Sequence, residues 1–532
     1  MGRGYLTVKT YLGDGAIPLR GIVVLIKELS GRLLYTLVTD ENGDTDRVPL
    51  PCPDKRLSQT PEYADESYSA YDVEIVQSGG FRGVNVFGVT IFDTIVSILP
   101  VRLEPVVALP MQPEQAENME IHIPPATVET MGSSSFGPEP CEGDDPDPPN
   151  EDAGPEESVH PLVTSPAFAN EVGIPYHITV HLGYPEDNKA RSVRVPFVDY
   201  IKNVASSEIF PTWDESAIYA NVLCQISYAL NRIYTLWYRS RGYDYDITNT
   251  TAFDQMFVYG RNIFENISRI VDEIFNLFLR RTGRREPFFA AYCNGTTTIC
   301  AGLSQWGSQE MALRGYTPIE ILRHYFPSDI QIVESVNFSE NAGVYPGIPL
   351  REGSVGDEVL KMQVYLNRIS GNYYISPINP PDGIFDRRMR TTVVEFQRIA
   401  NLAADGIIGR ATWYAITKYY VAVKNLAELE SEGERIGIGE TPPGVVLRMG
   451  SRGENVVELQ FLLNFISEFF PTIPFVIEDG VFRELTRNAV IEFQREFGLV
   501  PDGIAGPATW NALYAVYHSI TASLGEIGYP EL

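Results

Sequence analysis

Leu350-Arg-Glu-Gly-Ser-Val-Gly-Asp-Glu-Val-Leu-Lys-Met-Gln363 returns 97 positions later as Leu447-Arg-Met-Gly-Ser-Arg-Gly-Glu-Asn-Val-Val-Glu-Leu-Gln460. Four further pairs keep the same offset: Asp382–Phe385 with Asp479–Phe482, Val394–Arg398 with Ile491–Arg495, Asp405–Gly409 with Asp502–Gly506, and Ala411–Trp413 with Ala508–Trp510. A constant offset over five segments does not arise by chance. The sequence therefore contains a tandem repeat.

Each copy is predicted to form a small three-helix unit. In the first copy, apolar residues recur at helical spacing in two segments, at Val359, Met362 and Leu366 and again at Val393, Phe396 and Ile399. Asp-Gly pairs separate the helical segments. Glycine suits such turns because it lacks a Cβ and accepts a positive φ.

The repeated pattern resembles the peptidoglycan-binding domain 1 family. Both copies follow the family motif of Gly-x-x-Gly-x-x-Val-x-x-Leu-Gln, Asp-Gly-x-Phe, Phe-Gln and Asp-Gly-x-x-Gly-x-x-Thr-Trp nearly residue for residue. Asp386 and Arg483 stand where the family usually has a glycine. The resemblance implies two wall-binding modules, at residues 345–425 and 445–532, joined by a linker at 426–444.

Residues 1–112 carry a different pattern. Short β-branched or aromatic runs occur at Leu6–Tyr11, Ile22–Ile26, Leu33–Val38 and Tyr71–Val76. These runs and the polar turn between them predict an antiparallel β-sandwich, similar to the carboxypeptidase regulatory-like domains. No cluster of catalytic residue types lies in this domain.

The segment 113–165 is predicted to be a linker. Between Pro138 and Glu157 it has nine acidic residues, six prolines and no lysine or arginine. Such a segment repels itself and cannot bury apolar area, so we expect an extended, protease-accessible chain. A plain spacer and a site for an activating protease both fit this composition.

The whole chain of 532 residues is acidic, with 41 basic and 69 acidic residues and a formal net charge of −28. This charge argues against nucleic acid as a partner, because no positive field exists to release counterions from phosphates. It argues equally against binding to an anionic membrane surface. No uncharged apolar run reaches membrane-spanning length, and the first residues show no obvious signal peptide.

Residues 166–344 are predicted to form an α+β domain. Strands are expected at 178–183 and 192–197, and amphipathic helices at 216–239 and 262–279. With the parts on either side, this domain makes the chain a multidomain α+β protein.

Glu208 is the candidate general acid of this domain. It stands directly before the apolar segment Ile209–Trp213 and ahead of the predicted helix 216–239. Apolar surroundings disfavour the charged carboxylate and raise its pKa towards that of a working acid. A carboxylate in the first turn of a helix, where the dipole favours it, explains the same pattern.

Two further segments could carry chemistry. Ile247–Tyr259 combines hydroxyl and amide groups with aromatic rings, which suits sugar recognition, although a helix N-cap fits as well. Tyr292–Gly307 contains a Gln-Trp-Gly run and the two cysteines Cys293 and Cys300. These cysteines either pair as a disulfide or help to bind zinc. The nearest histidine is His324, so a four-ligand metal site is not supported.

Together these segments resemble the catalytic domain shared by stage II sporulation protein D and the LytB amidase-enhancer group. Ser206–Trp213 matches the Ser-Glu-x-x-x-x-Trp motif, and Gly302–Ala312 matches the Gly-Leu-Ser-Gln-Trp-Gly signature. A narrower resemblance, to spore cortex-lytic enzymes of the SleC type, rests on Val180–Pro185, Ala252–Phe264 and the Tyr-Cys-Asn-Gly segment. That family has an N-terminal β-rich prodomain, a removable joint and one wall-binding domain, where this chain has two.

The resemblance implies lytic transglycosylation of peptidoglycan glycan strands without a cofactor or metal. Glu208 would be the catalytic acid, and Gln255, Tyr292, Gln305 and Trp306 are candidates for binding the glycan. A packing role for Trp306 is at least as consistent with its residue type.

The same resemblance places the protein in the spore cortex, coat or cell wall of a bacterium. It also makes residues 1–112 a candidate prodomain, which an activating protease would release at the linker. The alternative is a non-catalytic peptidoglycan-binding scaffold or amidase enhancer, because tandem binding repeats alone only localise a chain.

Overall fold

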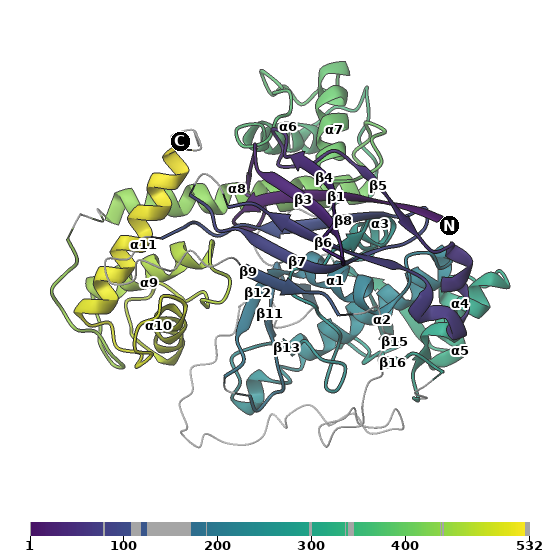
Figure 1. The fold of residues 1–532 in the computed structure, drawn as a ribbon, viewed down its shortest axis with the longest axis horizontal. Coiled ribbons are helices and arrows are strands. Elements are labelled where there is room, and N and C mark those ends of the chain that lie inside the picture. The colour runs from purple at the N-terminus through teal and green to yellow at the C-terminus, as the bar shows by residue number, and fades with distance from the viewer. Residues whose placement is uncertain are drawn as a thin grey trace.

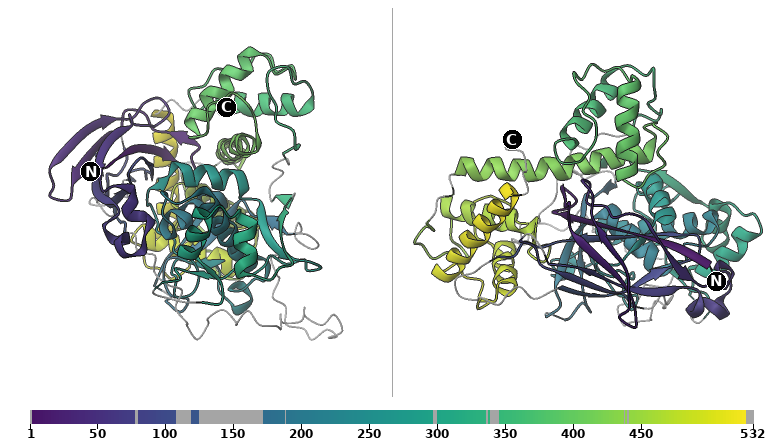
Figure 2. Two further views of the ribbon diagram at one scale, coloured as in Figure 1. Left: turned by 90° about the vertical axis from the view of Figure 1, so that its right-hand side faces the viewer. Right: turned by 45° about the horizontal axis from the view of Figure 1, so that its top comes forward.

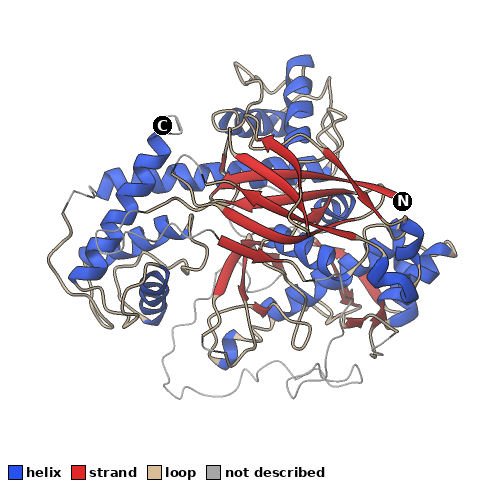
Figure 3. Ribbon diagram, viewed as in Figure 1, coloured by secondary structure: helices blue, strands red, loops and turns tan. Residues whose placement is uncertain are grey.

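The computed structural model describes residues 2–77, 80–107, 119–124, 172–187, 189–296, 300–335, 337–338, 345–436, 438 and 441–526. The N-terminal strands cross the middle of Figure 1, with the first repeat above them, the second repeat to the left and the middle domain below. Figure 3 shows that the long strands gather in the N-terminal part and that helices dominate the other three parts. The predicted multidomain α+β architecture is confirmed.

The N-terminal part consists of two sheets. The first contains β2 (Ile17–Pro18), β1 (Gly2–Leu12), β8 (Val96–Arg102) and β14 (Ile263–Phe264) in that order, with β5 (Val48–Cys52) also paired to β1. The second has the order β4 (Leu33–Val38), β3 (Val23–Glu28), β6 (Ser69–Ile75), β7 (Val84–Ile91), β9 (Met119–His122). Side chains alternate between the faces of a strand, so every second residue of β1 is buried in a core shared with the other sheet.

Two features of this part contradict the predictions. β1 lies parallel to β8 and β7 lies parallel to β9, so the sandwich is not purely antiparallel. Hydrophobic alternation indicates the faces of a strand but not the direction of its partner. In addition, β9 lies inside the predicted linker 113–165, where four residues are too few to stand out from polar neighbours. The acidic stretch of that linker lies outside the described residues.

The middle domain contains five α-helices, a short 3₁₀ helix (Arg239–Arg241) and four small sheets among its described residues. The helices are α1 (Phe197–Glu208), α2 (Glu215–Tyr234), α3 (Glu265–Ile274), α4 (Gln305–Leu313) and α5 (Pro318–Tyr325). The sheets pair β10 (Gly173–Ile174) with β19 (Asn337–Phe338), β11 (His177–His181) with β12 (Ser192–Pro196) and β13 (Ile247–Thr248), β15 (Leu277–Arg281) with β18 (Ile330–Glu334), and β16 (Tyr292–Cys293) with β17 (Leu303–Ser304). The two predicted strands are confirmed as β11 and β12.

The predicted helices are present but shorter. α2 ends at Tyr234 rather than 239, and Leu236 just beyond it has a positive φ of 50°. Of the predicted helix 262–279, only α3 is helical. The two ends are strands instead, because Ile263 pairs with Ile98 and Leu277 pairs with Glu334 in sheets. Periodicity within the segment could not reveal these partners, which are distant in sequence.

Each repeat forms the predicted three helices. They are α6 (Asp357–Ile369), α7 (Arg387–Ile399) and α8 (Arg410–Ile436) in the first copy, and α9 (Glu454–Ser467), α10 (Glu484–Glu496) and α11 (Pro507–Glu526) in the second. The apolar residues predicted to line the first two helices are buried. α8 continues to Ile436, so the predicted linker 426–444 is wrong over its first half.

The glutamines of the repeated motif hold the Asp-Gly turns. The backbone N–H groups of Asp382 and Gly383 donate to Gln363 Oε1 at 3.0 and 2.8 Å, and Gly480 donates to the equivalent Gln460 at 2.9 Å. Gly383 and Gly480 have φ values of 72° and 68°. The motif therefore has a structural role. Its buried glutamine side chain accepts hydrogen bonds from the backbone N–H groups of a turn that only glycine forms without strain.

The four parts pack against one another. One buried cluster joins the N-terminal sheets to the second repeat, and another joins the middle domain to the first repeat. Figure 2 shows α8 running from the first repeat towards the second. The candidate site therefore lies within a packed assembly of all four parts.

Candidate functional site

Glu208 is the last residue of α1, and the loop Ile209–Asp214 connects it to α2. The Asp214 side chain accepts from the N–H of Ser216 and so caps α2. The alternative that Glu208 occupies the first turn of a helix is wrong. At a helix C-terminus the dipole disfavours a carboxylate instead of stabilising it.

Three donors hold the Glu208 carboxylate. Tyr292 OH lies 2.6 Å from Oε2 and Gln225 Nε2 lies 2.8 Å from the same oxygen. The backbone N–H of Met256 donates to Oε1 at 2.8 Å. These donors come from β16, α2 and the loop after β13, so three separate elements fix both oxygens of one carboxylate.

The Glu208 side chain is almost completely shielded from solvent. Its exposed fraction is 4%. Burial raises the pKa of Glu208 from 4.5 to about 7, although the hydrogen bonds from Tyr292, Met256 and Gln225 act in the opposite direction. A carboxyl group with this pKa exists in both protonation states near neutral pH. It can therefore donate a proton in one step of a reaction and accept a proton in the next.

A second layer of hydrogen bonds positions the donors. Gln255 Nε2 donates to Tyr292 OH at 3.0 Å and to the Gln225 carbonyl at 3.2 Å. Tyr200 OH donates to Gln255 Oε1 at 2.9 Å. The buried Oε1 of Gln225 has no partner among the described residues. Rotating this amide by half a turn would let its Oε1 accept a hydrogen bond from a protonated Glu208.

Two of the four predicted binding residues lie in this network and two do not. Gln255 and Tyr292 belong to it. Gln305 and Trp306 begin α4, and no hydrogen bond among the described residues joins either side chain to Glu208. The Trp306 ring packs against Trp213 and Phe210, with centroids 4.8 and 5.5 Å apart, so the packing alternative describes this tryptophan.

Sequence reasoning missed Gln225, Tyr200 and the N–H of Met256. A backbone donor leaves no trace in the residue type. Gln225 had a detectable signal, since it is a fully buried amide within the apolar helix α2. A polar residue on such a face needs a partner, which here is Glu208.

Cys293 and Cys300 form a disulfide directly after Tyr292. This outcome settles the choice between pairing and zinc binding for these two residues. Within the described ranges, no three or more His, Cys, Asp or Glu side chains are grouped to hold a metal ion.

The N-terminal part covers the loop after Glu208. Trp213 Nε1 donates to the Ser58 carbonyl at 3.0 Å, and Gln59 Nε2 donates to the Thr212 carbonyl at 2.7 Å. The Phe92 ring stands edge-on to Phe210, with centroids 5.9 Å apart. The loop that leads from the carboxylate to α2 is therefore an interface between two parts of the chain.

The hydrogen bond from Tyr292 makes a testable contribution to the acidity of Glu208. Tyr292→Phe removes a donor that favours the charged form, so the pKa of Glu208 should rise. If Glu208 acts as an acid, the alkaline limb of the pH–rate profile should shift to higher pH, by as much as about one pH unit. Tyr200→Phe, which lies two hydrogen bonds further from Glu208 than Tyr292 does, serves as the control and should move the limb less. An unchanged limb in Tyr292→Phe would contradict the role of this hydrogen bond.

Both repeats match a known protein family. Residues 355–416 and 452–513 each match the family model described as "Putative peptidoglycan binding domain". The chain carries two peptidoglycan-binding repeats. Each match begins just before the first helix of its repeat, α6 or α9, and ends within the last, α8 or α11.

Two curated relatives share part of this chain. The N-acetylmuramoyl-L-alanine amidase CwlM of Mycobacterium tuberculosis is 30% identical over 135 residues, which cover 25% of this chain and 27% of that protein. The zinc D-Ala-D-Ala carboxypeptidase of Streptomyces albus G is 43% identical over 68 residues, covering 13% and 26%. The chain thus spans about a quarter of the length of these relatives. Its peptidoglycan-binding repeats and its distant similarity to cell-wall enzymes associate it with the bacterial wall.

None of the helices in the described residues combines the length and apolarity needed to cross a membrane.

Proposed function

We propose that this protein is a lytic transglycosylase that cleaves the glycan strands of peptidoglycan, with Glu208 as its catalytic acid. The observation that supports this most is the isolation of Glu208. Its carboxylate is buried, its pKa is raised to about 7, and its hydrogen-bond network contains no second carboxylate among the described residues. A glycosidase that uses water usually needs two carboxyl groups, whereas an intramolecular closure needs one.

The proposed reaction uses one carboxyl group twice. Protonated Glu208 gives its proton to the bridging glycosidic oxygen, and the bond from the anomeric carbon to that oxygen breaks. The sugar's C6 hydroxyl then forms a bond to the anomeric carbon, and its proton passes to the Glu208 carboxylate. The products are a 1,6-anhydro end and a free hydroxyl on the leaving strand, so no water is consumed. Gln225 and Tyr292 position the carboxylate for both transfers.

Binding to the wall is assigned to the two repeats, and cleavage to the middle domain. Tethering two wall-binding modules to one site raises the local concentration of glycan at that site. We propose the spore cortex as the wall layer on which the protein acts. This proposal rests on the resemblance to the SleC type.

The N-terminal part is proposed as a prodomain, because Ser58, Gln59 and Phe92 cover the loop after Glu208. An engineered protease site between residues 125 and 171 tests this proposal. Cutting there and separating residues 1–124 should raise the rate of glycan release. An equal rate before and after separation would contradict a restraining role. A rate that rises after separation would support an activating protease as a partner.

The rival functions are an amidase-type activity, which the names of the relatives suggest, and a non-catalytic scaffold or amidase enhancer. Mass spectrometry of purified peptidoglycan after digestion distinguishes them. New 1,6-anhydro ends support the transglycosylase, and free stem peptides indicate an amidase. Unchanged strands favour the scaffold.

The charge of the chain predicts how wall binding responds to salt. The protein has a net charge of −28 and its proposed ligand is also anionic, so attraction between opposite charges cannot drive binding. We expect wall binding to weaken by less than about twofold between low and moderate salt. Pull-down with insoluble peptidoglycan at several salt concentrations measures this. A steep loss of bound protein would contradict it.

A further inference from the structure

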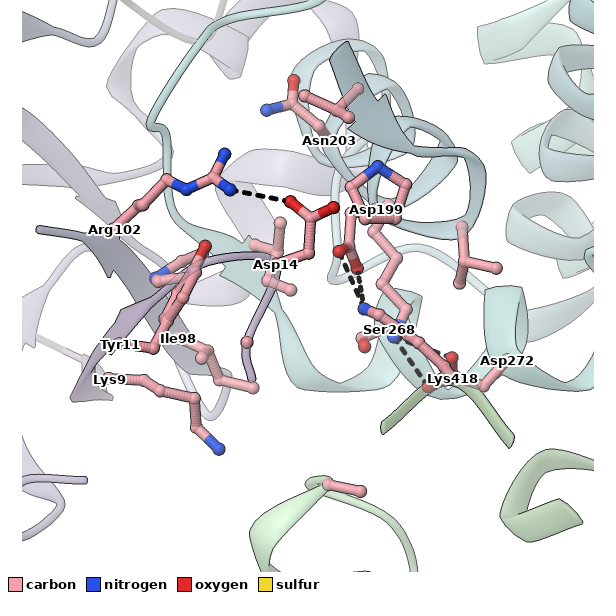
Figure 4. A pocket seen from close by; sticks show the side chains of 18 of the residues that line it. Lys9, Tyr11, Asp14, Ile98, Arg102, Asp199, Asn203, Ser268, Asp272 and Lys418 are labelled. Carbon is pink, nitrogen blue, oxygen red and sulfur yellow. Dashed lines mark hydrogen bonds and ion pairs between the residues drawn. The ribbon is translucent and has the colours of Figure 1, made fainter. Parts of the chain in front are cut away.

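A cavity of about 260 Å³ lies where the N-terminal part, the middle domain and the first repeat meet. Figure 4 shows Lys9 and Tyr11 of β1 on one side and Asp199, Ser268 and Lys418 on the other. This volume is slightly below the roughly 300 Å³ at which pockets for drug-sized ligands begin. The cavity therefore suits a molecule with about one ring.

Four of the five basic residues that line the cavity are paired with carboxylates: Lys9 with Asp44 at 3.2 Å, Arg102 with Asp14 at 3.0 Å, Lys202 with Asp272 at 2.7 Å and Lys418 with Asp199 at 2.6 Å. The fifth, Arg261, has no carboxylate within 4.0 Å in the described part of the chain. Each of the four pairs balances its own charge. One positive charge is therefore left over.

Arg261 is buried, with an exposed fraction of 3%. Its Nε donates to the Asn262 carbonyl at 2.9 Å, and its Nη2 lies 3.5 Å from Thr90 Oγ1, while Nη1 has no hydrogen-bond partner among the described residues. The guanidinium carbon also lies 5.8 Å from the centroid of the Phe264 ring, which carries no charge. Burial lowers the pKa of Arg261 to about 9, and no neighbouring charge offsets the effect. The guanidinium is still protonated at pH 7. A buried charge without a counterion is costly, and an anion in the cavity would relieve that cost.

Hydroxyl groups on the cavity wall are also unused. Tyr11, Tyr259, Tyr419 and Ser268 line it, and none of their side-chain hydroxyls has a hydrogen-bond partner within the described ranges. A hydroxyl can both donate and accept, so these groups match a ligand that carries several hydroxyls. The tyrosine rings also offer apolar faces against which a sugar ring can pack.

We propose that this cavity binds a single hydroxylated ring bearing one carboxylate, such as a sugar acid. Arg261 takes the carboxylate, and the tyrosine hydroxyls bond to the ring hydroxyls. A carboxylate fits better than a phosphate, because a phosphate monoester carries more negative charge at pH 7 than one guanidinium neutralises. The ligand would touch three parts of the chain at once and so stabilise their assembly. This proposal does not depend on the reaction at Glu208.

Isothermal titration of the full chain with N-acetylmuramic acid tests the proposal, and N-acetylglucosamine serves as the matched ring without a carboxylate. We expect one molecule of the acid per chain, bound at least tenfold more tightly than the neutral sugar, and a melting temperature that rises with its concentration. Equal affinity for the two sugars, or no binding of the acid, would overturn the proposal.

Three variants locate the binding. Arg261→Gln should weaken binding of the acid at least tenfold. Ala415→Phe, which fills the cavity from α8 without removing a charge, should abolish it. Tyr11→Phe removes one unused hydroxyl with little risk to folding and should weaken binding severalfold. The exposed Arg269→Gln is the control and should bind normally. Binding that survives all three cavity variants, or that is lost only in Glu208→Gln, would place the sugar elsewhere and overturn the proposal without bearing on the transglycosylase assignment.

Discussion

Glu208→Gln should lower the rate of glycan cleavage by about 10²- to 10⁴-fold, the contribution of a positioned general acid. The amide keeps the size of the carboxyl group and can still bond to the N–H of Met256 and to Gln225, but it has no proton to give. Wall binding should not change, because Glu208 and its hydrogen-bond partners Gln225, Met256 and Tyr292 all lie outside the two repeats. Release of soluble glycan from purified peptidoglycan measures the first effect, and pull-down measures the second.

Glu215→Gln is the matched control for this variant. Glu215 lies seven positions further along, its side chain is 70% exposed, and its partner is the exposed Arg269. We expect cleavage within about twofold of the wild type, because exposed ion pairs contribute little. If Glu208→Gln retained full cleavage, or if both variants lost it equally, Glu208 would not be the acid.

The second large effect is on stability and does not require activity. The pKa of Glu208 is about 7 in the folded protein against 4.5 ordinarily, so unfolded chains lose this proton at a lower pH than folded ones do. Ionisation of Glu208 therefore lowers the free energy of unfolding. This loss is absent below pH 4.5, grows between pH 4.5 and 7, and is complete above pH 7. The difference between the two pKa values corresponds to about 3 kcal/mol of stability. Glu208→Gln removes this loss.

Calorimetry at pH 5 and pH 8 measures this difference. The variant should gain melting temperature relative to the wild type as the pH rises, whereas Glu215→Gln should differ from the wild type by the same amount at both values. A pH-independent difference for Glu208→Gln would mean that the carboxyl is not buried as described.

The repeats were predictable because their signal is local. A constant offset, helical spacing and the Asp-Gly pairs all lie within each copy, and the structure confirms three helices in each. The burial of Glu208 was predictable for the same reason, since the apolar segment Ile209–Trp213 adjoins it. Its position at the end of α1 was not, because residues 197–208 mix polar and apolar side chains that are nearly all buried. Burial on all sides removes the amphipathic signal of a helix.

The contacts between parts of the chain could not be predicted. The pairing of Ile263 with Ile98 and of Met119 with Val84 depends on partners that no sequence window contains. The same holds for the cavity beside Arg261, whose lining comes from three parts of the chain. What the sequence showed of the site was the acid itself and two of its neighbours, Gln255 and Tyr292. Gln225 and the N–H of Met256 emerged only from the fold.

Cleavage of glycan by a single carboxyl group, without water, is tested most directly by digestion of purified peptidoglycan in H₂¹⁸O. The proposed closure predicts fragments that end in a 1,6-anhydro sugar, are one water lighter than hydrolysis products and contain no ¹⁸O. Their yield should fall by at least about 10²-fold when Glu208→Gln replaces the wild type. Reducing ends labelled with ¹⁸O would show that water attacks the anomeric carbon, and they would contradict the claim.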